Sequence, residues 1–248
     1  MATRIVGIDC AVQPTKVGIA LASIDDSNCR ILDARRCSAN DLPADAVSAW
    51  HNDGSLSVIA LDAPLGWPVA LSNALHDHFA GEAIFAGADQ LFRRATDKDI
   101  YRRLGKQPLD VGANFIARTA KAALGLLDEL RTRTGEPIPL AWKMTVPERT
   151  SAIEVYPAAT IRSSALPVVD YKKPSQSDGR RRIIEALPGW FDITAVREAV
   201  TESSDVLDAV LCILAAVDFC HGRAVPPTDE NLALKEGWIW AGRQQNDG

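Results

Sequence analysis

The chain has 248 residues, of which 47% are hydrophobic and 24% are charged, and this composition is typical of a globular protein with one large core. Its formal net charge is −5, so any contact with nucleic acid has to come from a local basic patch. The sequence shows neither a secretion signal nor an apolar run of about 18 residues, so we expect a cytoplasmic protein without membrane contact.

The first expected elements are three strands, over residues 3–11, 15–25 and 30–38, joined by the turn-rich segments VQPT and DDSN. Such short links predict an antiparallel meander. A short helix over 42–51 follows. The apolar run SLSVIALDAPLG at 55–66 then predicts a strand that is buried on both faces. The expected order is therefore βββαβ.

From about residue 67 to 150 the hydrophobic pattern has helical periodicity, in the segments PVALSNALHDHF, TDKDIYRRLG and NFIARTAKAALGLLDELRTRTG. We interpret this block as a helical insertion in a single domain that covers residues 1–243. The polar residues 244–248 are expected to form a disordered tail.

Strand character returns at 151–160, where Pro157 is expected to end the strand. A polar and basic stretch follows, and then a strongly apolar run at 203–222 predicts the last long helix. Ser203 or Ser204 is expected to cap it, because a serine oxygen can accept from a free N–H of the first turn.

Carboxylates stand near the C-terminal ends of the predicted core strands: Asp9 in VGIDCA, Asp62 in IALDAP and Glu154 in AIEVYP. A right-handed crossover would place the strand at 55–66 parallel beside the first strand, so Asp9 and Asp62 are expected to lie side by side. Sites in open α/β sheets form beyond such strand ends. Two carboxylates about 4 Å apart repel by about 4 kcal/mol at an effective dielectric constant near 20, so we expect a cation between them.

Asp205 and Asp208 are three residues apart in the predicted last helix and therefore project from one face. Asp205 has a structural alternative, because the helix dipole favours an acid in the first turn. Asp208 lies among apolar residues, where an unpaired charge is costly. A metal ion or a structural salt bridge could satisfy it.

A ligand set of oxygen atoms alone, without His or Cys, favours Mg²⁺ or Mn²⁺. The five cysteines form no CxxC pair, which indicates reduced thiols rather than a zinc site. Two hard ions about 3.5–4 Å apart can activate a water and stabilise the leaving oxygen of a phosphodiester. We therefore predict metal-assisted hydrolysis. The candidate catalytic residues are Asp9, Asp62, Glu154, Asp205 and Asp208.

Six motifs, GIDCA, ALDAPLG, FRRATD, EVYPAAT, DVLDA and EGWI, occur in an order that resembles a family of uncharacterised domains described as predicted nucleases with an RNase H-like fold. The similarity covers about residues 4–240. The DVLDA motif also resembles resolvases of the RuvC type.

This resemblance implies an α/β, RNase H-like fold with a mixed five-stranded sheet flanked by helices. It also implies a nuclease that uses two Mg²⁺ or Mn²⁺ ions on DNA or RNA. By matching position, it implies four metal ligands, namely Asp9, Asp62, Asp205 and Asp208. Glu154 lies on a later strand than the acids of that superfamily and is outside this set.

The segment RRATDKDIYRRLGK offers contacts to substrate phosphates. Thr96 and Asp99 have the spacing of a capping box, which would start a helix there. The candidate phosphate contacts are Arg93, Arg94, Lys98 and Arg102. A solvated charged surface is the alternative. A second basic cluster at 172–182 is expected on a mobile loop, where it could bind a nucleic-acid backbone or only increase solubility.

Two other functions remain open at this stage. A non-catalytic nucleic-acid or metal-binding module could keep the fold and the acids. An actin-like or sugar-kinase-like phosphotransferase also begins with a strand and an aspartate, but it needs a second related domain and a Gly-rich phosphate loop that this sequence lacks. A homodimer is neither required nor excluded.

Overall fold

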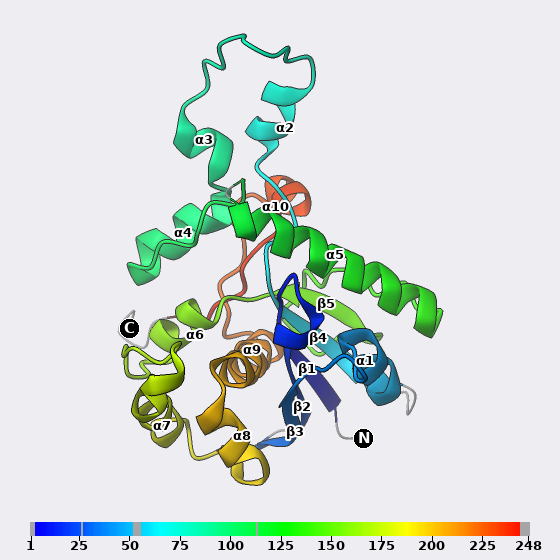
Figure 1. Ribbon diagram of the computed structural model, residues 1–248, viewed down its shortest axis with the longest axis vertical. Helices are drawn as coiled ribbons and strands as arrows, with labels where there is room; N and C mark the ends of the chain where they lie inside the picture. The colour runs from blue at the N-terminus through cyan, green and yellow to red at the C-terminus, as the bar shows by residue number, and fades with distance from the viewer. Residues whose placement is uncertain (1–2, 26, 52–55, 113, 244–248) are drawn as a thin grey trace.

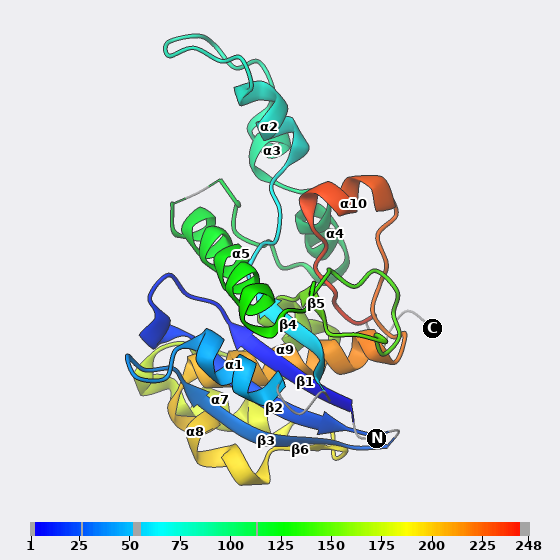
Figure 2. The same cartoon turned by 90° about the vertical axis from the view of Figure 1, so that its right-hand side faces the viewer.

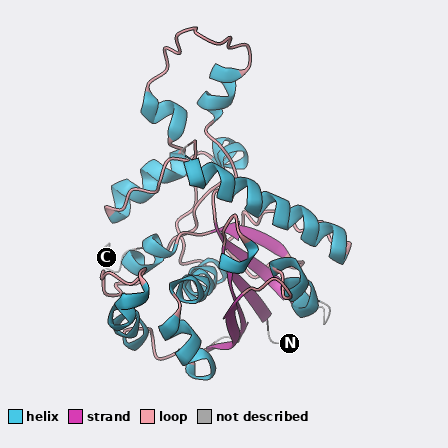
Figure 3. Ribbon diagram, in the orientation of Figure 1, coloured by secondary structure: helices cyan, strands magenta, loops and turns pink. Residues whose placement is uncertain are grey.

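The computed structural model describes residues 3–25, 27–51, 56–112 and 114–243, and the tail predicted at 244–248 lies outside these ranges. One sheet with helices on both sides forms the body of the protein (Figures 1 and 3). Its strands are β1 (Thr3–Asp9), β2 (Gly18–Ile24), β3 (Cys29–Arg36), β4 (Leu56–Asp62), β5 (Ser151–Glu154) and β6 (Phe191–Asp192).

The helices between and after these strands range from single turns to α5, which has 21 residues. The α-helices are α1 (Pro43–His51), α2 (Val69–Leu75), α3 (Ala88–Phe92), α4 (Ala95–Leu104), α5 (Asn114–Thr134), α6 (Pro157–Ser163), α7 (Ser177–Glu185), α8 (Arg197–Glu202), α9 (Ser204–Cys220) and α10 (Glu230–Glu236). Short 3-10 turns lie at Pro14–Lys16, Pro174–Gln176 and Thr194–Val196. Within the described ranges, no helix is both long enough and apolar enough to cross a membrane.

The sheet has the strand order β5-β4-β1-β2-β3-β6. Strands β1, β2 and β3 form an antiparallel meander, and β4 and β5 continue the sheet as parallel strands on the other side of β1. This arrangement confirms the predicted βββαβ order and the RNase H-like α/β fold. The sheet is one strand wider than expected, because β6 pairs with β3. Its two residues are too few to show strand periodicity in the sequence.

Both faces of β4 are buried, as its apolar run predicted, and helices lie on both sides of the sheet (Figure 2). Along β1, Ile5 packs under α9, whereas Val6 and Ile8 pack under α1 and α5. Along β4, Val58 and Ile59 divide in the same way. We call these the α9 face and the α5 face. Alternate residues of each strand point to alternate faces, so the position of any side chain at a strand end follows from its register.

Helix α9 approaches the sheet so closely that two positions of the strands below it have room only for glycine. A Cβ atom on Gly7 of β1 would lie 2.0 Å from the carbonyl oxygen of Ala209, and one on Gly18 of β2 would lie 2.0 Å from that of Asp205. Both distances are far below van der Waals contact, so these glycines fix how α9 sits over β1 and β2. This contact places the N-terminal turns of α9 beside the end of β1.

Two element boundaries outside the insertion can be compared with their predictions. The cap of α9 is confirmed, because the Ser203 hydroxyl accepts a hydrogen bond from the N–H of Val206. The strand expected at 151–160 is shorter, since β5 ends at Glu154 and Pro157 opens α6 instead of only ending the strand. Proline suits the first helical turn, where its missing N–H costs no hydrogen bond.

The predicted capping box of α4 was placed two residues too late. The N–H of Arg94 donates to the carboxylate of Asp97, so Arg94 and Asp97 are the first and last residues of the box. The hydroxyl of Thr96 instead accepts from the N–H of Ile239 near the C-terminus. A tertiary contact thus determines the role of Thr96, and no local pattern in the sequence reveals it.

The segment predicted as a helical insertion contains α2 to α5. Helices α2 and α3 and their connection extend away from the body (Figure 1), and Phe79 and Phe85 on this arm are 73% and 96% exposed. Helix α5 instead packs on the α5 face through Ala123, Leu127 and Leu130. The bounds of the insertion and the single domain over 1–243 stay predictions.

The glycine contact under α9 gives a stability prediction. Gly7→Ala should destabilise the fold by about 3 kcal/mol or more, at the upper end of the usual cost of overpacking, because its methyl group would meet backbone atoms. Gly125→Ala is the matched control. A Cβ atom there meets nothing within 4 Å, and alanine in a helix is about 0.5–1 kcal/mol better than glycine. Urea unfolding of both variants measures the difference, and equal stabilities would contradict the close approach of α9.

Candidate functional site

Asp9 and Asp62 lie side by side at the C-terminal ends of β1 and β4. They are paired Cα neighbours in the parallel register, as predicted. Asp9 is two residues after Gly7 on β1, and Asp62 is four residues after Val58 on β4. Residues at even spacing in a strand point to the same face, so both side chains leave the sheet on the α9 face. Among the described residues, neither carboxylate forms a hydrogen bond or an ion pair. The end of the sheet therefore carries two adjacent acids without partners.

Asp208 of α9 is the third acid at this end of the sheet, and its side chain is fully buried. The hydroxyl of Tyr171 donates to its Oδ1 atom over 2.8 Å. The ammonium of Lys172 forms an ion pair with its Oδ2 atom. Both oxygens of Asp208 are thus engaged, so the salt bridge that the sequence left as an alternative does form.

Asp205 lies one turn earlier on α9 and is only partly buried. Its carboxylate pairs with the guanidinium of Arg36 on β3, with a distance of 3.2 Å between Nε and Oδ2. Its negative charge still acts on Asp9. Asp205 therefore belongs to the edge of the acidic group, and its role as a metal ligand stays a prediction.

Burial and mutual repulsion raise the pKa values of these acids. Burial raises the pKa of Asp9 well above its ordinary value, and the charges of Asp208 and Asp62 raise it further. Burial, followed by the charge of Asp208, raises the pKa of Asp62 to about 8. The site therefore resists holding all of its negative charge, and a cation would relieve that repulsion.

Lys172 supplies a cation at this site, although the sequence placed it only in a basic loop. Burial lowers the pKa of the Lys172 amine, but the carboxylates of Asp208 and Asp9 outweigh this effect and raise the pKa overall. The amine is therefore charged. The signal that could have located it is weak, because Lys172 is one of many basic residues between 172 and 182.

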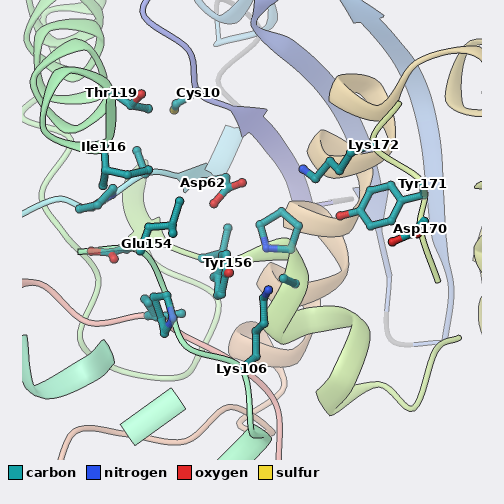
Figure 4. A pocket seen from close by; sticks show the side chains of 18 of the residues that line it. Cys10, Asp62, Lys106, Ile116, Thr119, Glu154, Tyr156, Asp170, Tyr171 and Lys172 are labelled. Carbon is teal, nitrogen blue, oxygen red and sulfur yellow. The ribbon is translucent and has the colours of Figure 1, made fainter. Parts of the chain in front are cut away.

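A cavity of about 610 Å³ opens beside Asp62, and residues from α5, from α6 and from the loop after α4 line it (Figure 4). Lys106, Tyr156 and Lys172 bring polar groups to it. Burial, together with the charge of Asp62, raises the pKa of Tyr156 to about 12, so its hydroxyl stays protonated. Sequence reasoning missed Lys106, Tyr156 and Tyr171. Tyr156 stands in the EVYPAAT motif and Lys106 ends the segment RRATDKDIYRRLGK, but nothing in either pattern assigns these two residues to the site.

Glu154 does not join Asp9 and Asp62. It is the register partner of Leu61, which packs on the α5 face, so its carboxylate leaves the sheet on the face opposite to Asp62. There Glu154 accepts two hydrogen bonds from the guanidinium of Arg94, at 2.7 and 2.9 Å, and one from the N–H of Leu65 at 3.0 Å. These contacts give Glu154 a structural role.

Arg94 is 1% exposed, so its guanidinium has no access to a substrate phosphate. It also donates to Asp97 at 2.9 Å and to the backbone carbonyl of Glu236 at 3.1 Å. The Glu236 carboxylate in turn accepts from the N–H groups of Val69 and Ala95. We call Arg94, Asp97, Glu154 and Glu236 the buried clasp. It joins β5, α4, α10 and the segment after β4.

The other candidate phosphate contacts lie nearer the surface. Arg93 pairs with Asp89 and Asp110, at 2.9 and 3.2 Å. Lys98 is exposed, and Arg102 is 72% exposed and pairs with Asp99. Lys98 and Arg102 are therefore the accessible members of the predicted set.

The second basic cluster was expected on a mobile loop, but residues 177–185 form helix α7. Within this cluster Arg180 is fully buried, and its guanidinium donates to backbone carbonyl groups on both sides of it in the sequence. A buried arginine that binds backbone explains why this segment is ordered. Its first residues, Tyr171 and Lys172, are held at the acidic site.

The donor set can be compared with the metal that the sequence predicts. In the described part of the chain, no group of three or more His, Cys, Asp or Glu side chains is arranged to hold an ion. Asp208 already binds Tyr171 and Lys172, one at each oxygen, and its role as a third ligand stays a prediction. Asp9 and Asp62 offer carboxylate oxygens without partners, which suit a hard ion such as Mg²⁺ or Mn²⁺. The pair therefore fits such an ion.

A family model described as "Protein of unknown function (DUF429)" matches residues 7–231 of the chain. No curated protein sequence matches it. Among solved structures, the chain is similar to T. thermophilus RuvC in complex with a Holliday junction substrate, with 12% identity and a TM-score of 0.33 over 88% of this chain and 97% of that one.

The contrast between bare and paired acids gives a second prediction. Asp62→Asn should melt above wild type in chelator, by about 2–4 °C for each kcal/mol of repulsion removed. Excess Mn²⁺ should reverse or narrow this order, because an ion that binds the native state stabilises wild type by mass action and the variant lacks a ligand. Glu154→Gln is the matched control. It breaks a buried ion pair, so it should cost about 3–5 kcal/mol in both buffers.

The stabilities of wild type and Asp62→Asn in chelator should also depend differently on pH. The pKa of Asp62 is about 8 in the folded protein and about 4 in an unfolded chain, so wild type binds a proton on folding and loses stability as the pH rises between these values. Asp62→Asn lacks this titration. Its advantage in chelator should therefore widen from about pH 6 to about pH 8. An Asp62→Asn variant that is less stable than wild type in both buffers would mean that Asp62 is a structural acid.

Proposed function

The chain belongs to the DUF429 family of proteins of unknown function, and from its site we propose that it hydrolyses phosphodiester bonds of nucleic acid with the help of a divalent metal ion. The adjacent Asp9 and Asp62 carboxylates carry this proposal. They lack partners, repel each other and lie where ligands bind in open α/β sheets, beyond the carboxyl ends of parallel strands.

Asp9 and Asp62 would hold a Mg²⁺ or Mn²⁺ ion through their free oxygens. Such an ion, when bound, supplies Lewis-acid polarisation of a phosphodiester and a water that ionises near neutral pH. Asp205 and Asp208 place further negative charge beside the pair and strengthen the attraction for a cation. All-oxygen ligands at this position support phosphate chemistry better than redox or thiol chemistry.

The cavity beside Asp62 would position the nucleic-acid backbone. Tyr156 keeps its proton at neutral pH and can donate a hydrogen bond to a phosphate oxygen. Lys106 lines the same cavity and would attract the phosphate by charge. The accessible Lys98 and Arg102 lie on α4, immediately before Lys106 in the chain, and would extend this contact to neighbouring phosphates. These cations provide the local basic patch that an acidic protein needs.

Asp9→Asn tests the activity directly. Purified protein should cleave at least one nucleic acid in a panel of single-stranded DNA, duplex DNA, four-way junction and RNA, and only with Mg²⁺ or Mn²⁺ present. The substitution should abolish this cleavage and leave the melting temperature in chelator at or above that of wild type. Asp77→Asn on the exposed arm is the matched control and should cleave like wild type.

Full Mn²⁺-dependent cleavage by Asp9→Asn would rule out the site. If wild type binds Mn²⁺ and nucleic acid but cleaves no member of the panel, the non-catalytic module is the better description.

Substrate binding gives a further prediction. If Lys98 and Arg102 contact phosphates, the double variant Lys98→Ala, Arg102→Ala should bind nucleic acid more weakly, and its plot of log K against log salt should be flatter by about two units. A matched double variant away from the site, Arg30→Ala with Arg133→Ala, should keep the wild-type slope, because Arg30 lies at the end of the sheet opposite to Asp9 and Arg133 in the last turn of α5. An unchanged slope in the first variant would make its residues ordinary surface charges.

A further inference from the structure

Lys172 is a largely exposed lysine whose ammonium lies at the acidic site, which is unusual for a surface residue. Its side chain is 59% exposed, yet its ammonium pairs with the fully buried carboxylate of Asp208. The same ammonium interacts electrostatically with Asp9 and Asp62. It therefore lies within the field of all three acids at the end of the sheet, in the region where the sequence predicted metal ions.

Hydrogen bonds to backbone carbonyl groups fix the position of the chain around Lys172. The buried guanidinium of Arg180 donates to the carbonyl oxygens of Tyr171 at 2.6 Å and Lys173 at 2.9 Å, which flank Lys172. The hydroxyl of Ser204, at the start of α9, donates to the carbonyl oxygen of Lys172 itself at 3.1 Å. These bonds attach Lys172 to the helix that carries Asp208. Its position is thus part of the folded core and not a choice of side-chain rotamer alone.

The number of negative charges at the site and the number of unpaired carboxylates both indicate one divalent ion. Once all three are ionised, as ligand binding to a cation requires, Asp9, Asp62 and Asp208 carry three negative charges, and Lys172 neutralises one of them. The two charges that remain match one divalent ion. Each carboxylate oxygen of Asp208 already accepts from one donor, Tyr171 at Oδ1 and Lys172 at Oδ2, and a cation near Oδ2 would meet the Lys172 ammonium. Of the acids described at this end of the sheet, Asp9 and Asp62 are the ones whose carboxylates form no hydrogen bond or ion pair.

We propose that this site takes a single divalent ion, between Asp9 and Asp62, and that the ammonium of Lys172 occupies the place of a second cation beside Asp208. This inference rests on the proposed function and corrects its expected stoichiometry from two ions to one. Lys172 is then a positioning residue. Its charge keeps Asp208 from acting as a ligand, and its ammonium has further N–H donors beside the cavity that Lys172 lines, where a phosphate would bind.

A titration of the full chain with Mn²⁺ tests this inference without an activity assay. The number of bound ions is measured by calorimetry and by the electron spin resonance signal of free Mn²⁺. Wild type should bind one ion. Lys172→Met should bind two, because Asp208 is released, and the first should bind roughly tenfold tighter because a nearby positive charge is gone. Lys172→Arg keeps the charge and should bind one ion. Lys173→Met, the neighbouring control, should also bind one.

Asp208→Asn provides a second variant if Lys172→Met does not fold in chelator. It should still bind one ion, because Asp208 is not a ligand. Two ions in wild type, falling to one in Asp208→Asn, would overturn the inference while leaving the metal-dependent function in place. One ion in both wild type and a folded Lys172→Met would also overturn it. No binding by wild type would remove the metal site and the proposed function together.

Discussion

The backbone contact between α9 and the sheet determines the geometry of the candidate site. At Gly7 and Gly18 the helix carbonyls lie where a side chain would otherwise stand, so α9 cannot shift along β1 and β2 without a clash. Asp208 is one residue away from Ala209, which contacts Gly7, and Asp9 is two residues beyond Gly7. The separation of these acids is therefore set by backbone packing, which resists the repulsion between them.

The buried clasp, on the other face of the sheet, connects distant segments of the chain. Arg94 and Glu154 resemble catalytic residues in the sequence, because a charged residue in a conspicuous motif often has a chemical role. In the folded protein they saturate each other, and Glu236 and Asp97 bind the remaining N–H groups around them. Breaking one partner of such a group leaves a buried charge without compensation. The clasp joins segments that are up to 167 residues apart, and so connects the region between β4 and α4 to α10.

The sequence was sufficient to predict the acids that local rules determine. A strand buried on both faces predicted the parallel position of β4, and this register alone brings Asp62 to Asp9. Helical spacing placed Asp208 on the same face of α9 as Asp205. The same rules fail for Lys172 and Tyr171, which reach Asp208 across 36 and 37 residues. Their position depends on the contacts of Arg180 with the backbone, and a sequence shows Arg180 only as one arginine among several.

The presence or absence of a hydrogen-bond or ion-pair partner distinguishes the structural acids of this protein from its candidate metal ligands. The fully buried carboxylates in the described ranges have partners: Asp97 and Glu154 bind Arg94, Glu236 binds backbone N–H groups, and Asp208 binds Lys172 and Tyr171. Asp9 and Asp62 have none among the described residues, although burial and neighbouring charges raise their pKa values. Folding alone would be favoured by a neutral or paired side chain at these positions. A fold that pairs its fully buried acids and leaves these two partly buried ones bare has the electrostatic arrangement expected of a cation site next to a cavity.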